Sequence, residues 1–208
     1  MPDQSTTGLS SDTGLPSSTG RPSNTEFQLG GVNHVALVCK DMARTVDFYT
    51  NVLGMPLIKT LEIPGGAQHF FFDCGNGDSV AFFWFPNAPE GVPGISGAAQ
   101  MPGRGDITSA HGSMNHLAFD IPADKFDEYV DKLRAKGVKV GAVLNHDDSE
   151  RTVAPELHDG VFVRSVYFCD PDGIVLEFAC WTKTFGPADA RHAPAQADGT
   201  RASLATAR

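Results

Sequence analysis

Two histidines occupy the same place in two similar apolar segments of the chain. The segment Val32–Leu37 (VNHVAL) returns as Met114–Phe119 (MNHLAF), with His34 and His116 in the same slot. Each segment precedes an amphipathic helical stretch that ends in glycine, so each predicts a strand that opens a strand–helix unit. Imidazole is a common metal ligand and acid–base group. The repeat therefore places two chemically capable side chains at equivalent points.

Glu177 is a third candidate, because it is the one charged residue in the apolar run Ile174–Trp181 (IVLEFACW). An ionised carboxylate buried without a partner is costly, so we expect Glu177 to be protonated, paired with a cation such as Arg164, or bound to a metal. Two neutral imidazoles and one carboxylate form the facial triad that holds non-haem Fe(II). Core histidines and a structural ion pair are the alternative interpretation of the same residues.

The elements that would carry these side chains follow the same order twice. The first unit is predicted to contain the His34 strand, a helix from Asp41 to Gly54, and strands over 56–63, 68–74 and 79–85. The second is predicted to contain the His116 strand, a helix over 122–136, and strands over 138–144, 163–169 and 174–181. The fold class is therefore α+β, with two βαβββ modules.

Composition sets the domain boundaries. Residues 1–28 and 185–208 are rich in small and polar residues, and we expect a flexible N-terminal arm and a flexible C-terminal tail. Between them we expect one domain, 29–184, made of module one (29–87), a Gly/Pro-rich linker or lid (88–112) and module two (113–184).

The charge and hydropathy of the chain exclude some classes of partner. A net charge of -9, without a Lys/Arg cluster, argues against nucleic acid, and no apolar run is long enough to span a bilayer. The four cysteines lack CxxC spacing and are interpreted as buried thiols of a reducing compartment. We expect a cytoplasmic protein that forms a homo-oligomer, since oligomers are common.

Paired βαβββ modules with candidate ligands on their first and last strands resemble the vicinal oxygen chelate superfamily. That superfamily includes glyoxalases, epimerases, antibiotic-resistance proteins and extradiol ring-cleaving dioxygenases, and its modules form a metal-binding cleft. The spacing around Glu177 is similar to the extradiol signature. It runs from His158 through Val166-Tyr167 and the Asp170–Gly173 turn to Glu177, with Glu156 as the one departure.

The resemblance is closest to the one-domain extradiol dioxygenases that act on catechols such as 2,3-dihydroxybiphenyl. It implies that His34, His116 and Glu177 hold Fe(II), with Mn(II) as the alternative metal, and that a small aromatic diol and O₂ are the substrates of a ring cleavage in aromatic catabolism. It also implies that His158 and Tyr167 bind the substrate and act in catalysis. A surface histidine and a strand aromatic are the plain alternatives for these two.

One position departs from the glyoxalase-type sites and another from the larger extradiol enzymes. The fourth ligand slot of glyoxalase-type sites falls near Phe82, which cannot bind a metal and is expected instead to line the substrate site. The slot of a further acid–base histidine is taken by Asp78, a weak base at its usual pKa. His69, His111 and His146 are possible substitutes. A glyoxalase-like or epimerase-like lyase or isomerase, or a small-molecule binding or resistance protein, is the alternative function.

Overall fold

Each half of the chain forms a strand, a helix and a set of further strands in that order. The computed structural model describes residues 26–202. Module one contains β1 (His34–Cys39), α1 (Met42–Asp47), the π-helical turn η1 (Phe48–Val52), β2 (Leu57–Ile63), β3 (Ala67–Gly75) and β4 (Asp78–Trp84). Module two contains β5 (Leu117–Asp120), the 3-10 turn η2 (Ala123–Lys125), α2 (Phe126–Ala135), β6 (Val143–His146), β7 (Val153–Ala154), β8 (Val163–Cys169) and β9 (Val175–Trp181).

The strands form two sheets with matching topology. The first sheet has the order β1-β4-β3-β2 and the second has the order β5-β9-β8-β6-β7. In each sheet the first strand pairs in parallel with the last strand of its module, and the other neighbours are antiparallel. This confirms the predicted α+β class with two βαβββ modules, to which module two adds the short strand β7.

The helix of module one begins and ends as its sequence indicates. Asp41 caps α1, because its carboxylate accepts a hydrogen bond of 3.1 Å from the backbone nitrogen of Arg44. Gly54 follows the last turn with a φ of 76°, a conformation that glycine adopts without strain. The predicted single helix is in fact two pieces, since its second half widens into η1.

One hydrophobic core is shared by the two modules. Tyr49 packs against Phe72 and Phe82, with ring centroids 5.4 and 4.8 Å apart, and the same cluster includes Phe168 and Leu176 of module two. The hydroxyl of Tyr49 also donates to Asp170, and the Lys136 ammonium donates to the carbonyls of Asn51 and Val52. The unit Leu29–Thr184 is thus held together by packing and by polar bonds between modules.

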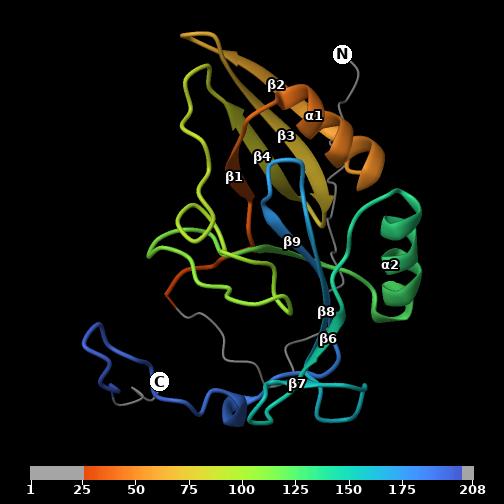
Figure 1. Cartoon of the computed structure of the whole chain (residues 1–208), viewed down its shortest axis with the longest axis vertical. Helices are drawn as coiled ribbons and strands as arrows, with labels where there is room; N and C mark the ends of the chain where they lie inside the picture. The colour runs from red at the N-terminus through yellow and green to blue at the C-terminus, as the bar shows by residue number, and fades with distance from the viewer. Residues whose placement is uncertain (1–25, 203–208) are drawn as a thin grey trace, which may run out of the picture. The chain divides into compact units, whose positions relative to one another are not determined.

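The candidate ligands lie on the opposite faces of the strands from this core. Leu37 and Cys39 of β1 point into the core, so strand alternation turns His34 the other way. Leu176 points into the core from β9, and alternation likewise turns Glu177 away from it. Figure 1 shows α1 and α2 on one side of the two sheets and the 88–112 linker on the other.

Some details differ from the sequence predictions. The predicted strand 138–144 begins only at Val143, because Val138 and Val140 pack into the core from an irregular segment instead. Cys169 is exposed rather than buried, whereas Cys39 and Cys180 are buried and all four thiols are free.

Outside 29–184, the described residues form little regular structure. Residues 1–25 of the predicted arm lie outside the described residues. Within 185–202 the chain forms the 3-10 turn η3 (Pro187–Asp189) and an isolated bridge between Ala195 and Arg201. None of the helices in the described part is long and apolar enough to cross a membrane.

Candidate metal site

His116 and Glu177 form the centre of the candidate site. His116 directly precedes β5, and Glu177 lies in the middle of β9, which pairs in parallel with β5. The Nε2 atom of His116 is 3.0 Å from Oε2 of Glu177. The Glu177 side chain is only 6% exposed, and that of His116 is 33% exposed. The two side chains that the sequence singled out in module two therefore meet.

Asn115 determines which nitrogen of His116 faces the carboxylate. The amide nitrogen of Asn115 donates to the carbonyl of Ile107 at 2.6 Å, which directs the amide oxygen toward Nδ1 of His116 at 3.0 Å. An amide oxygen only accepts hydrogen bonds, so Nδ1 carries the proton. In the neutral ring, the lone pair of Nε2 then points at Glu177.

A cation between these two atoms would satisfy both. An imidazole lone pair and a carboxylate oxygen 3.0 Å apart repel unless a proton or a metal ion lies between them. A divalent ion held by both residues would take the lone pair of Nε2 and one carboxylate oxygen. The donor set of one imidazole and one carboxylate suits divalent iron, manganese or zinc. The pair therefore fits part of a metal site.

Tyr167 and Ser165 lie beside this pair on β8. Tyr167 is the register partner of Glu177, and its ring stands edge-on to His116 at 5.5 Å between centroids. Burial, together with the neighbouring Glu177 carboxylate, raises the pKa of Tyr167 to about 12, so the phenol stays protonated near neutral pH. The hydroxyl of Ser165 is fully buried and lies close enough to Glu177 to help lower the pKa of that carboxyl, although it makes no hydrogen bond of regular geometry. This incompletely bonded hydroxyl is consistent with a site built for a further ligand.

The charge of Glu177 is stabilised locally and not by Arg164. Burial favours the neutral carboxyl, but the neighbouring His116, Ser165 and Tyr167 groups outweigh it and lower the pKa of Glu177. Arg164 points to the other face of β8, where it forms two hydrogen bonds to Asp127 and lies over the Phe126 ring. The ion pair between Arg164 and Glu177, one of the alternatives from sequence, is therefore absent.

His34 repeats the local geometry of His116 in module one. Its Nδ1 atom is 2.7 Å from the side-chain oxygen of Asn33, which again leaves Nε2 free to face outward. Its register partner is Ser79 of β4, and its side chain is exposed. Among residues 26–202, no three His, Cys, Asp or Glu side chains are grouped to hold a metal ion. A ligand role for His34 therefore remains a prediction.

A row of aromatic rings extends from His34 across the same sheet face. Successive ring centroids are 5.6, 4.3, 3.6 and 5.5 Å apart along the series His34, Phe71, His69, Phe83 and Phe85. His69 and Phe83 stack in parallel, and Nδ1 of His69 donates to the carbonyl of Phe82 at 3.1 Å. Phe71, Phe83 and Phe85 are therefore the aromatic rings that share this face with His34 and His69.

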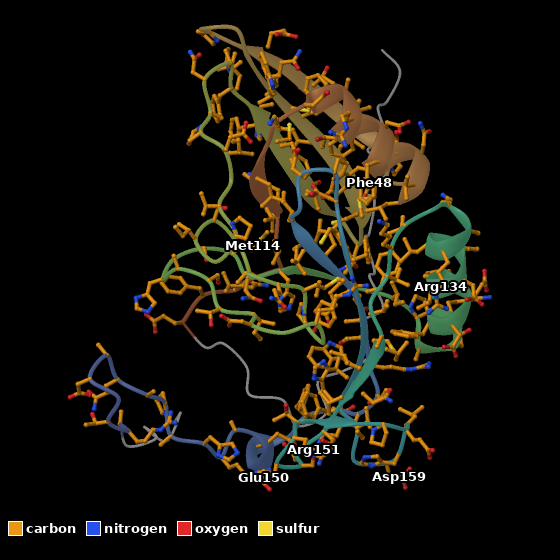
Figure 2. All side chains as sticks on the ribbon, in the orientation of Figure 1. Phe48, Met114, Arg134, Glu150, Arg151 and Asp159 are labelled. Atoms are coloured by element: carbon orange, nitrogen blue, oxygen red, sulfur yellow. The ribbon has the colours of Figure 1, made fainter. Side chains whose placement is uncertain are left out.

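His158 lies away from the site in this structure. Its Nδ1 accepts a hydrogen bond from the Gly160 backbone, and its Nε2 is 3.3 Å from the Asp147 carboxylate. It precedes β8 at the Val163 end, and Val163 and Tyr167 are separated by about 13 Å of extended strand. Figure 2 shows the neighbouring Asp159 at the far end of module two from Met114, which leads into Asn115. A substrate role for His158 would require its loop to move and remains a prediction.

The prediction for Phe82 needs correction, whereas an acid–base role for Asp78 stays a prediction. Phe82 is fully buried in the shared core against Tyr49, so it does not line a substrate site. The β4 residues that share the sheet face of His34 are Ala81 and Phe83, so the predicted position was one residue away from this face. By the same alternation, Asp78 is on the face of Val80, away from His34. The position of Asp78 thus gives no support to an acid–base role.

Comparison with known proteins agrees with this architecture. Residues 31–178 match the family model of the Glyoxalase/Bleomycin resistance protein/Dioxygenase superfamily. This match covers more than half of the chain and includes both modules, so the protein belongs to that superfamily. Members of the superfamily are often metal-dependent enzymes.

Individual relatives are distant. The chain is 26% identical over 148 residues to the metallothiol transferase FosB of Lysinibacillus sphaericus, covering 71% of this chain and 79% of the relative. It is 26% identical over 162 residues to the putative ring-cleaving dioxygenase MhqE of Bacillus subtilis, covering 72% of this chain but only 47% of the relative. A glyoxalase family protein from Enterococcus faecalis has a similar fold, with a TM-score of 0.50, 22% identity, and coverage of 72% and 97% of the two chains.

Proposed function

We propose that this protein is an extradiol ring-cleaving dioxygenase that acts on catechols such as 2,3-dihydroxybiphenyl with Fe(II) and O₂. The observation that most directly supports this proposal is the position of Tyr167, which lies against both His116 and Glu177. A phenol with a pKa of about 12 is a hydrogen-bond donor at neutral pH, and beside the two ligands it would donate to a bound diol. The similarity to a putative ring-cleaving dioxygenase supports the same reaction class.

In this proposal His116 and Glu177 hold the metal from one copy of the chain. Fe(II), when bound, would bring the diol and O₂ together and supply the redox chemistry of the cleavage. Asn115 keeps Nε2 of His116 available, while Tyr167 orients the substrate. The burial of Glu177 and Tyr167 limits access of bulk water to this side of the site.

We further propose that a second copy of the chain supplies His34. The shared core turns the His34 face of module one and the His116 face of module two away from it. The His34 face is also partly exposed and carries apolar side chains, with Val38 49% and Phe85 41% exposed. A symmetric dimer would cover this face and bring its aromatic row opposite His116 and Glu177, where flat rings suit an aromatic substrate.

The direct test is anaerobic loading with Fe(II), followed by 2,3-dihydroxybiphenyl or catechol and then O₂. We expect a yellow ring-cleavage product together with O₂ consumption. Tyr167→Phe, loaded in the same way, is expected to retain iron and react more slowly. Iron-loaded wild type that consumes no O₂ with either catechol would contradict the proposed reaction for these substrates.

A metal-dependent thiol transferase is the second candidate. It is favoured by the similarity to FosB, of whose length the chain covers 79%, against 47% for the dioxygenase relative. Loss of free thiol from a mixture of a small thiol, an electrophilic acceptor and the metal-loaded protein would support this reaction. The aromatic row beside His34 favours the catechol, because a stacking surface suits a flat aromatic ring.

A further inference from the structure

The 88–112 linker packs against module two next to its ligand face. Gly103 approaches the side chain of Leu144, whose register partner is the buried Ser165. The Arg104 guanidinium donates to the carbonyl of Val140 at 3.5 Å, and Met101 lies beside Gly141. The linker therefore accounts for part of the burial of the groups around Glu177.

The same linker is hydrogen-bonded to the side chain that orients His116. Asn115 donates from its amide nitrogen to the carbonyl of Ile107 at 2.6 Å, and a longer contact of 3.3 Å reaches the hydroxyl of Ser109. Its amide oxygen faces Nδ1 of His116. The Asn115 amide thus contacts both the linker and Nδ1 of His116. A change in the linker position would therefore affect which tautomer His116 adopts beside Glu177.

Module one provides an internal comparison. Asn33 faces Nδ1 of His34 in the same way, at 2.7 Å. Its amide nitrogen donates no hydrogen bond to any residue within 26–202, and no linker segment is anchored there. The Asn-His pair is therefore repeated in both modules, whereas the connection to the linker belongs to module two alone.

We infer that Asn115 is a positioning residue that couples closure of the linker to metal binding by His116 and Glu177. A metal on Nε2 requires the proton to stay on Nδ1, and this tautomer is held by an amide that the linker keeps in place. Such coupling is reciprocal, so metal binding also stabilises the closed linker. The inference rests on the proposed metal site. It adds that the contact between Asn115 and the linker depends on whether the site holds a metal ion.

Trypsin provides a local probe of this coupling, because Arg104 is the one Lys or Arg within 88–112. Mn(II) alone serves as the metal probe, and its affinity is measured by the loss of the free-ion EPR signal. In wild type we expect Mn(II) to slow cleavage after Arg104. In Asn115→Asp, an oxygen still faces Nδ1 of His116, but the donor to Ile107 is replaced by a second oxygen that repels the carbonyl. We expect Arg104 cleavage at least about tenfold faster and Mn(II) affinity about tenfold lower.

The matched control is Asn33→Asp, which should leave the rate of Arg104 cleavage in the metal-free protein at the wild-type value. Leu144→Ala loosens the linker from its other end without touching Asn115 or a ligand, and it should also speed cleavage and weaken Mn(II) binding. Thermal unfolding of each variant verifies that the domain remains folded. These variants separate release of the linker from general loss of structure.

The imidazole tautomer gives a readout that a purely structural role of Asn115 would not change. In metal-free wild type, long-range ¹H–¹⁵N NMR should show a proton on Nδ1 of His116 in both the neutral and the charged ring, with a second proton on Nε2, facing Glu177, in the charged ring alone. In Asn115→Ala the neutral ring should move its proton to Nε2, where it can donate to Glu177.

The possible outcomes are distinct. Wild type that binds no Mn(II) would overturn both the metal site and the coupling. Wild type that binds Mn(II), with wild-type affinity and wild-type cleavage in Asn115→Asp, would overturn the coupling and leave the proposed function intact.

Discussion

The Nε2 atom of His116 and the Oε2 atom of Glu177 lie 3.0 Å apart, although 60 positions of sequence separate the two residues. The parallel pairing of β5 with β9 produces this proximity, since it places Ala118 opposite Glu177 and His116 on the same face. Glu177→Gln keeps the shape of the side chain and removes its charge. We expect this variant to lose at least about 100-fold in Mn(II) or Fe(II) affinity, because a first ligand matters more than its supporting residues.

Isothermal titration calorimetry checks the affinity of Glu177→Gln. Glu128→Gln is a suitable control, because Glu128 is an exposed carboxylate on α2 that pairs with Lys125 and Lys132. It should bind metal as wild type does. Unchanged metal affinity in Glu177→Gln would show that the ion binds elsewhere.

Complementation between two inactive variants tests the composite site. His34→Ala and Glu177→Ala should each be inactive alone. If each site takes His34 from one copy and Glu177 from the other, a mixed dimer contains one intact site and one doubly defective site. Co-refolding equal amounts makes half of the dimers mixed, so about a quarter of the wild-type activity should return. Recovery no greater than the sum of the two variants would place the whole site within one chain.

Tyr167→Phe separates metal binding from turnover. The phenol lies beside Glu177 without being a charged ligand, so its removal should change metal affinity little. Loss of a hydrogen-bond donor to the reacting group should lower kcat by about 10²-fold. Steady-state kinetics on the iron-loaded variant, with iron content measured in parallel, provide the check. A loss of iron equal to the loss of activity would assign Tyr167 to metal retention instead.

Asp170 predicts a specific pH dependence of stability. Its carboxylate accepts backbone hydrogen bonds from Asp172 and Ile174, but burial dominates and raises its pKa from 3.8 to about 6. Between these two values the folded state holds more protons than the unfolded state, so this group stabilises the fold below about pH 4 and loses that contribution as the pH rises through 6. The change is on the order of 3 kcal/mol.

Asp170→Asn keeps an oxygen for the two backbone donors and cannot titrate. The free energy of unfolding of wild type relative to this variant should therefore decrease between pH 4 and pH 7. Urea denaturation at several pH values measures it, and the other carboxylates cancel in the difference. A constant difference across this range would show that Asp170 titrates normally.

Much of the fold could be predicted because its strands carry strong local signals. The predicted strand 163–169 coincides with β8, and the predicted 174–181 differs from β9 by one residue. Gly54 and Asp41 mark the helix ends by backbone chemistry that does not depend on the rest of the fold. The start of β6 was missed, because Val138 and Val140 are buried by the core without being in a strand.

The site was predictable only where burial and charge conflict in the sequence. Glu177 is such a case, and its pairing with His116 follows from strand order. The face of Phe82 was missed because a one-residue error in register reverses every side chain of a strand. The bonds of His158 to Asp147 and Gly160 depend on a loop whose path the sequence pattern does not specify. Asn33 and Asn115 were visible as a repeat, and their position before each histidine was the signal for a supporting role.

The shared core has a consequence for how the polypeptide can be divided. One core cluster contains side chains from both modules, namely Tyr49, Phe82, Phe168 and Leu176. A chain cut in the linker should therefore remain one folded domain, because this packing does not depend on the linker. The two halves, expressed from separate genes, would then be expected to find each other and refold together. The intact linker would then contribute little to the association of the two modules. Its main contribution would be the contacts that it makes beside His116 and Glu177.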